Sequence, residues 1–316
     1  MKSIFGVDMS MQSFEVAIDG EERVIQIANT MKAIRVWLKQ VPAQSLIGVE
    51  STGHYHRLLV RAAIAAGHTV YVLNARDLSH YASALGRRAK TDRLDALMIA
   101  RYLKHEHERL FPYTLPSALQ EQLDELIARR HGIVVAHGAL RASLKSATTQ
   151  LKCTALALKA LKKLIAEIDA HLQDLTSQDP ALATHAAHLQ NVVGFGPLVS
   201  ISLAHALTRR AFKNDDAFIA YVGIDPKVRD SGHLKGRRIL SKRGPAEYRR
   251  LLFLAAMAAC KTALWKPFYQ RYRQRGLSTI EALVILARKL ARVAFAIVKN
   301  NIDFDPNRIK IACAQP

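Results

Sequence analysis

The first thirty residues alternate between short apolar segments and short polar turns, which is the pattern of β-strands. The turns cover residues 9–13 and 19–22. Because turns this short join neighbouring strands that run in opposite directions, we expect antiparallel hairpins. The three predicted strands are Ser3–Asp8, Phe14–Ile18 and Val24–Asn29.

Beyond residue 30 helical segments alternate with short, wholly apolar segments. Helices are predicted at Met31–Lys39 and His56–Ala66, and buried strands at Leu46–Glu50 and Thr69–Leu73. A further helix follows in the apolar run from Leu94 to Leu103. The resulting order βββαβαβα joins an antiparallel part to a parallel part, which is the element order of the RNase H fold. We therefore predict an α/β N-terminal domain of this class.

Leucine and isoleucine recur at roughly heptad spacing through the middle of the chain, from residue 117 to residue 175. Pro116 and Pro180 bound this region. The spacing predicts two long antiparallel helices, a coiled-coil arm that would provide a dimer contact. Ordinary helix packing within one domain is the alternative interpretation.

The last third of the chain is predicted to be mainly α-helical. Gly194 and Gly196 form a tight turn between two helical segments, a helix-hairpin-helix pattern whose second helix presents free N–H groups to a nucleic-acid phosphate. A plain glycine turn explains the same residues equally well. Ser278 and Glu281 form a capping box that begins an amphipathic helix ending near Lys299. The predicted domains are therefore residues 1–112, 113–180 and 181–316.

Positive charge distinguishes this chain from an ordinary globular protein, because its formal net charge is +20 and its pI is near 10.1. A charge of this size favours a polyanionic partner. The region from 227 to 250 is a basic, glycine-punctuated loop of the kind that binds a phosphodiester backbone, although a solvated basic loop is the simpler interpretation. Together with the two glycines above, the residues expected to bind nucleic acid are Lys227, Arg229, Lys235, Arg237, Arg238, Ser241, Lys242, Arg243 and Arg249.

Acidic residues stand where the predicted fold would bring them together. Asp8 ends the first strand, Glu50 ends the fourth, and Asp92 and Asp95 begin a late helix. Each has a local explanation as a turn acid or a helix-start acid. All four in this order indicate a carboxylate site for Mg²⁺ or Mn²⁺, where two ions could polarise a phosphate and stabilise a leaving oxygen.

Several other classes of protein fit the sequence poorly. No apolar run reaches membrane-spanning length, and the N-terminus has no signal-peptide pattern. Three scattered cysteines show neither zinc spacing nor a disulfide framework, which suits a cytoplasmic protein. Sugar kinases and actin-like ATPases share the fold, but the second glycine-rich phosphate loop that they need is not evident, so we keep that interpretation as a minor one.

Five motifs resemble, in order and across nearly the whole chain, those of the DEDD transposases of the insertion-sequence-110 family. The motifs are GVDMS, GVESTGHY, KTDRLDA, NVVGFGPLVS and YVGIDPKVRDSGHLKGRRILSKRG. The resemblance implies a RuvC-like N-terminal domain, a coiled-coil arm and a C-terminal transposase domain of a bacterial insertion sequence. It also implies that Asp8, Glu50, Asp92 and Asp95 bind the metal and that Ser231 is the nucleophile.

The same resemblance implies the partners: donor and target DNA, a structured non-coding guide RNA, and further copies of the chain, as a dimer and as a tetramer in the synaptic complex. The expected reaction is strand exchange through a covalent phosphoserine intermediate, which stores bond energy and needs no ATP. Two alternatives stay open. One is a Holliday-junction nuclease, in which the acids activate water; the other is a non-catalytic, basic RNA-binding scaffold.

Overall fold

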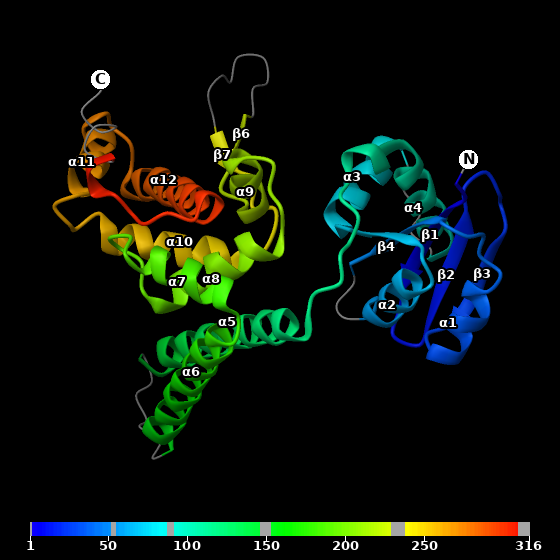
Figure 1. The fold of residues 1–316 in the computed structure, drawn as a ribbon, viewed down its shortest axis with the longest axis horizontal. Coiled ribbons are helices and arrows are strands. Elements are labelled where there is room, and N and C mark those ends of the chain that lie inside the picture. The colour runs from blue at the N-terminus through cyan, green and yellow to red at the C-terminus, as the bar shows by residue number, and fades with distance from the viewer. Residues whose placement is uncertain (1, 52–54, 87–91, 146–152, 229–237, 309–316) are drawn as a thin grey trace. The chain divides into compact units, whose positions relative to one another are not determined.

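The structure is a computed structural model that describes residues 2–51, 55–86, 92–145, 153–228 and 238–308. The chain divides into two compact units, Met1–Leu115 and Pro116–Pro316, drawn in Figure 1. Each unit is described by itself. No helix within the described ranges is both long enough and apolar enough to span a membrane.

A mixed five-stranded sheet in the order β3-β2-β1-β4-β5 forms the centre of the N-terminal unit. The first three strands pair antiparallel, whereas β4 pairs parallel with β1 and with β5. This arrangement confirms the predicted βββαβαβα order, with element ends shifted by a residue or two. The strands are β1 (Ile4–Met9), β2 (Ser13–Ile18), β3 (Val24–Ala28), β4 (Leu46–Glu50) and β5 (Thr69–Leu73).

Helices cover both faces of this sheet, two on each (Figure 1). On one face, α1 (Met31–Leu38) and α2 (Arg57–Ala65) bury Trp37 and Leu59 against Phe5, Val7 and Phe14. On the other face, α3 (Ala75–Ala84) and α4 (Asp92–Glu106) pack Leu78, Ile99 and Leu103 against Leu46 and Leu73. A short 3-10 helix, His107–Arg109, ends the unit's last helical segment.

The closest approach in this unit is between α4 and β1. Gly6 lies directly under α4, and a methyl group in its place would overlap the backbone atoms of Ala96 and Ala100. One strand away, Gly48 is covered by the side chains of Ile99 and Leu103. The two glycines therefore let the helix backbone lie directly on the sheet.

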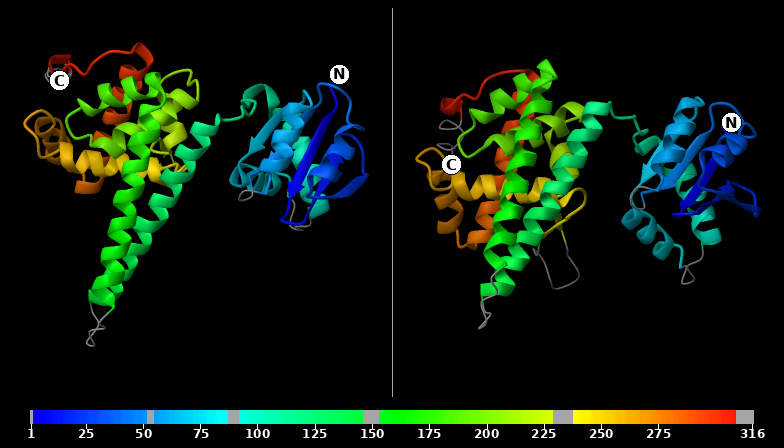
Figure 2. Two further views of the ribbon diagram at one scale, coloured as in Figure 1. Left: turned by 60° about the horizontal axis from the view of Figure 1, so that its bottom comes forward. Right: turned by 90° about the horizontal axis from the view of Figure 1, so that it is seen from below.

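A hairpin of two long helices and a compact helical body make up the C-terminal unit (Figure 2). Its core is large and continuous, and it includes the fully buried Trp265 and Phe218. The hairpin helices are α5 (Ala118–Lys145) and α6 (Thr154–Ser177). The body contains α7 (Pro180–Gln190), α8 (Pro197–Arg209), α9 (Asp215–Val222), α10 (Ala246–Ala259), α11 (Lys266–Gln274) and α12 (Thr279–Asn300).

The predicted capping box is confirmed at the start of α12. The Ser278 hydroxyl accepts the Glu281 N–H at 3.3 Å, and the Glu281 carboxylate accepts the Ser278 N–H at 2.8 Å. These hydrogen bonds lower the pKa of Glu281. The predicted buried face of α12 is also confirmed, since Leu283, Leu286 and Leu290 lie in the core.

The base of the α5–α6 hairpin belongs to the core of the body, whereas its far part does not. Leu123, Ile127 and Leu172 are buried at the base, but Leu164 is 42 % exposed and Leu156 is 68 % exposed. The heptad pattern is therefore only partly buried within one chain. A coiled coil and a separate arm domain over 113–180 stay predictions.

Partly buried ion pairs fix α5 to its neighbours. Asp124 on α5 accepts hydrogen bonds from His205, at 2.9 Å, and from Arg209, both on α8. Burial alone would raise the pKa of Asp124, but the hydrogen bond from His205 and the charges of Arg209 and His205 together hold it below its usual value. Arg130 binds Asp169 of α6 at 2.5 Å, so α5 is held from two sides.

We predict that Gly6→Ala destabilises the N-terminal unit by about 1–3 kcal/mol, because the added methyl group must push α4 away from β1. The measurement is the denaturant midpoint of the full chain. Gly132→Ala is the control, since nothing lies within 4 Å of its added methyl group on the exposed side of α5. That control should leave stability equal or raise it by up to about 1 kcal/mol. Equal midpoints for Gly6→Ala and the parent protein would contradict the close packing.

Candidate active site

Two of the four predicted metal ligands, Asp8 and Glu50, lie level with each other on neighbouring parallel strands. The β1–β4 register pairs Gly6 with Gly48 and Val7 with Val49, so the next pair along is Asp8 with Glu50. Side chains alternate between the two faces of a strand, and Gly6 and Gly48 face α4. Asp8 and Glu50 therefore project from the sheet on the α4 side, at its edge formed by the strand ends.

The helix α4 runs in the opposite direction to β1, which brings its first turn toward this edge. Lys104, near the end of α4, forms a 2.7 Å ion pair with Asp19, whose N–H donates to the Ile4 carbonyl at the start of β1. Earlier in the helix, Ala96 and Ala100 lie over Gly6. The helix start, with Asp92 as its first residue and Asp95 one turn before Ile99, consequently lies toward Asp8.

A complete metal centre is not observed within the described residues, which contain no group of three histidine, cysteine, aspartate or glutamate side chains arranged to hold an ion. The side chain of Asp92 lies outside the described part of the structure. The four-carboxylate site, and the Mg²⁺ or Mn²⁺ that it would bind, therefore stay predictions. The backbone arrangement of β1, β4 and α4 is consistent with them.

A further acid on the same face was not found from the sequence. Glu15 of β2 is paired directly with Asp8 across the antiparallel β1–β2 ladder. Directly opposed residues project to the same side of a sheet, so Glu15, Asp8 and Glu50 form a row across three strands. Finding Glu15 from the sequence would have required the register of the hairpin, which the hydrophobic pattern alone gives only to within a residue or two.

In the C-terminal unit, a two-stranded hairpin leads toward the predicted nucleophile. Strand β6 (Pro226–Val228) pairs antiparallel with β7 (Arg238–Leu240). Ser231 and the predicted nucleic-acid ligands Arg229, Lys235 and Arg237 lie between these strands, outside the described residues, as does the side chain of Arg238. Their roles stay predictions, and the hairpin base is the part of this region that can be examined.

Ser241 holds the base of the hairpin rather than facing solvent. Its side chain is 2 % exposed, and its hydroxyl donates a hydrogen bond to the Asp225 carboxylate. The Ser241 N–H donates to the Asp225 carbonyl at 3.0 Å. These contacts give Ser241 a structural role in joining the two ends of the hairpin, and the phosphate contact expected for it has no support from its position.

Two glycines with positive φ angles make the close crossing at the hairpin base possible. Gly223, with φ of 76°, lies against the Arg243 backbone, and Gly244, with φ of 81°, lies against the Tyr221 carbonyl. A methyl group at either position would overlap backbone atoms. The chain segments before β6 and after β7 are therefore packed backbone to backbone, which gives the hairpin a rigid base.

The other predicted nucleic-acid ligands of this region divide into two groups. Arg249 donates to the carbonyl groups of Val222, Arg243 and Gly244, at 3.1, 3.2 and 2.8 Å, and burial lowers its pKa. It therefore stabilises the hairpin base. Lys242 and the side chain of Arg243 are exposed beside the hairpin, and Lys227 is half-buried on β6.

The predicted glycine turn connects α7 to α8, as a helix-hairpin-helix requires. Gly194, with φ of 105°, packs tightly on α10, where its added methyl group would lie 2.6 Å from the Ala259 Cβ. Gly196 is the N-cap residue of α8 and has open space around it. Packing thus accounts for Gly194, and phosphate binding at Gly196 stays a prediction.

Half-buried Arg288 on α12 was also missed by the sequence analysis. Its Nε atom is buried and has no hydrogen-bond partner within the described part of the chain. Burial lowers the pKa of Arg288, the neighbouring Arg292 lowers it further, and the charges of Asp216 and Asp225 oppose this. Arg288 is therefore a partly desolvated cation near Asp225, at the base of the β6–β7 hairpin.

The fold of the N-terminal unit is compatible with a DEDD transposase, and two family profiles assign the chain to this class. One, described as "Transposase", matches residues 5–153, and one, described as "Transposase IS116/IS110/IS902 family", matches residues 186–270. The chain belongs to the IS110/IS116/IS902 family of insertion-element transposases.

Curated relatives resemble the chain along most of its length. A "Probable family 20 transposase" of Pseudomonas aeruginosa is 26 % identical over 343 aligned residues, covering 96 % of this chain and 99 % of the relative. A "Pilin gene-inverting protein" of Moraxella bovis is 26 % identical over 273 residues, covering 81 % of each chain. The corresponding protein of Moraxella lacunata shows the same identity and coverage.

We predict that Ser241→Ala destabilises the C-terminal unit by about 1–3 kcal/mol, because Asp225 then loses the hydroxyl that donates to it in a buried position. Thermal unfolding of the purified chain measures the effect. Replacing both partners, with Ser241→Ala and Asp225→Ala, should cost less than the sum of the two single changes. Strictly additive losses would contradict a direct interaction, and an unchanged midpoint for Ser241→Ala would contradict its structural role.

Proposed function

We propose that this transposase cuts and rejoins DNA through a covalent phosphoserine intermediate, with its acidic residues binding divalent metal and an element-encoded RNA directing it to DNA. The observation that carries the proposal is the parallel β1–β4 register, which places Asp8 and Glu50 at matching positions one residue beyond the Val7–Val49 pair, on the side of the sheet that α4 covers. This arrangement supports a shared carboxylate site. The donor and target DNA are the substrates.

The donor set fits a hard divalent cation. Carboxylate oxygens are the ligands that Mg²⁺ and Mn²⁺ prefer, and adjacent carboxylates repel each other unless a cation lies between them. Asp8 and Glu50 would hold the metal from the sheet, and Asp92 and Asp95 from α4. When bound, the metal would polarise the phosphate and stabilise charge on the leaving oxygen. Glu15 contributes a further negative charge beside Asp8.

The proposed nucleophile is Ser231, which lies in the sequence between β6 and β7, the two strands whose base is fixed by Asp225 and Ser241. Its hydroxyl oxygen attacks the scissile phosphorus, and the bond from phosphorus to the 3′ oxygen breaks. The serine proton leaves, the 3′ oxygen takes a proton, and the protein becomes esterified to the 5′ phosphate. Attack by a 3′ hydroxyl from a partner strand then reverses these steps, joins the new strands and restores the serine.

The buried Ser241 hydroxyl supports the choice of Ser231 between the two serines. A nucleophile must reach a phosphate, whereas the Ser241 hydroxyl is engaged by the Asp225 carboxylate in a position that is 2 % exposed. The names of the Moraxella relatives support strand exchange in general, since gene inversion requires DNA strands to be cut and rejoined at both ends of the inverted segment. The net charge of +20 is compatible with both DNA and RNA partners.

We further propose that the chain acts as a dimer, and as a tetramer in the synaptic complex, with the acids of one subunit serving the serine of another. Exposed Leu156 and Leu164 on the far part of α6 support self-association there. Ile168 of α6 lies in the core at the base of the α5–α6 hairpin, so its side chain stabilises the fold of one chain and does not contact a second copy.

We predict that Asp8→Asn and Glu50→Gln each lower DNA cleavage by about a hundredfold or more, because each removes a charged metal ligand while keeping the size of the side chain. Cleavage of labelled donor DNA is followed with RNA over a Mg²⁺ titration. Glu15→Gln is the matched control from the same row and should lose much less. If cleavage stays near normal in Asp8→Asn or Glu50→Gln at saturating Mg²⁺, the ligand assignment is wrong.

We predict that Ser231→Ala abolishes the covalent protein–DNA adduct, whereas Ser241→Ala, tested below its unfolding temperature, still forms it. Denaturing electrophoresis of protein incubated with labelled DNA, RNA and Mg²⁺ detects the adduct. Mixing Ser231→Ala with Asp92→Asn should restore part of the recombination if the site is shared between subunits. Cleavage without any adduct in the parent protein would favour the water-activating nuclease, and an adduct that persists in Ser231→Ala would exclude this serine.

A further inference from the structure

The two helices on one face of the N-terminal sheet carry cations and no acids. Residues 31–41 and 55–68, which include α1 and α2, contain no aspartate or glutamate. The same two segments carry the cations Lys32, Arg35, Lys39, Arg57 and Arg61, all of them exposed. The acids Asp8, Glu15 and Glu50 project on the opposite, α4 side of the sheet. The outer surface of α1 and α2 is therefore cationic.

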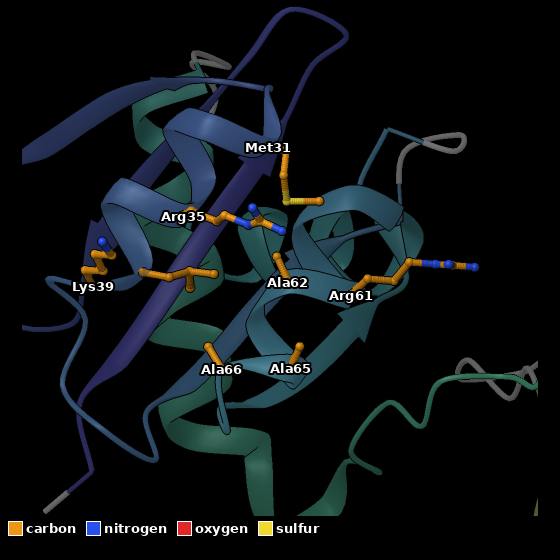
Figure 3. Close-up of a pocket in the computed structure, with 8 residues that line it drawn as sticks. Met31, Arg35, Lys39, Arg61, Ala62, Ala65 and Ala66 are labelled. Atoms are coloured by element: carbon orange, nitrogen blue, oxygen red, sulfur yellow. The ribbon is translucent and has the colours of Figure 1, made fainter.

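A groove between α1 and α2 concentrates this charge (Figure 3). Its volume is about 470 Å³. Apolar side chains line its floor: Met31 and Leu38 from α1, and Ala62, Ala65 and Ala66 from α2. Arg35, Lys39 and Arg61 also line it. The Arg35 side chain extends from α1 toward α2, whereas the Arg61 side chain points away from α1 (Figure 3). The groove thus has an apolar floor and a cationic rim on the α1 side.

The cations of the α1 rim have no acidic partner within the described part of the chain. Arg35 and Lys39 are exposed and form no ion pair with a described residue. Unpaired cations held beside one another repel, which favours an anionic ligand over solvent alone. Alanine and methionine on the floor give a smooth surface that a sugar ring can approach, while its phosphates reach the rims.

We propose that the α1–α2 groove binds the sugar–phosphate backbone of duplex DNA, at a segment remote from the bond being cut. Deoxyribose packs on the apolar floor, and consecutive phosphates pair with Arg35 and Lys39. Transposition joins two DNA segments, so a transposase must hold DNA away from its catalytic carboxylates as well as beside them. The sheet separates this groove from Asp8 and Glu50, so the two surfaces contact different parts of the DNA.

The first test measures binding of a duplex of about 30 base pairs to the full chain, without Mg²⁺, across a series of salt concentrations. The variant is Arg35→Gln with Lys39→Gln. The control is Lys2→Gln with Arg23→Gln, which removes the same charge from exposed positions outside the groove. Losing two phosphate contacts should lower the slope of log affinity against log salt by about two and weaken binding roughly tenfold or more.

The control should change the slope much less, and both proteins should keep the parent melting temperature. Equal slopes for the groove variant and the control would overturn the proposal. This proposal rests on the proposed function only in taking DNA as the substrate. Because binding is measured without Mg²⁺, its outcome does not depend on whether Ser231 forms a covalent bond to DNA.

The second test identifies the occupant by lysine acetylation. Duplex DNA should protect Lys39 from acetylation and leave Lys2 reactive, in the parent protein at low salt. Protection of Lys39 by structured RNA but not by duplex DNA would overturn the proposal and assign the groove to RNA. Adduct formation is also compared on a short DNA that ends close to the scissile bond. If the groove variant fails to form the adduct on this DNA, the groove contacts the reacting segment, and the proposal of a remote contact is overturned.

Discussion

The contact of α4 with β1 at Gly6 is the packing constraint on which the proposed carboxylate site of the N-terminal unit depends. The helix backbone lies directly on the sheet because neither Gly6 nor Gly48 has a side chain to hold it away. A helix this close to the strand ends can contribute carboxylates from its first turn to those of Asp8 and Glu50. Larger residues at these two positions would raise the helix and separate the two sets of acids. The two glycines thus support the proposed site through packing alone.

The β6–β7 hairpin of the C-terminal unit also depends on glycine. Its base combines the close backbone crossing at Gly223 and Gly244 with the Asp225–Ser241 hydrogen bond. Arg249 completes it by donating to the carbonyl groups of Val222, Arg243 and Gly244. Residues that the charge pattern assigned to nucleic acid thus make contacts that hold the protein backbone. Burial separates these two roles, and burial follows from tertiary packing rather than from residue type.

The strand and helix order of the N-terminal unit could be predicted because its signals are local. Strands β1 to β5 are short apolar segments between turns, and Ser278 with Glu281 begins α12 by a local capping box. Positions that depend on register or on distant packing could not be predicted. Glu15 joins Asp8 only through the hairpin register, and Arg249 reaches carbonyl groups that precede it by up to 27 residues. The heptad leucines of α6 marked a helix correctly, but their spacing could not distinguish buried Leu172 from exposed Leu164.

The position of the α1 and α2 cations also has an electrostatic consequence. These helices lie on the face of the sheet opposite to α4, so the sheet separates Arg35 and Lys39 from Asp8 and Glu50. Carboxylates alone would repel the phosphates of a polyanion, whereas exposed cations attract them over a distance. Cations on α1 can therefore attract a polyanion to this unit without lying beside the two carboxylates.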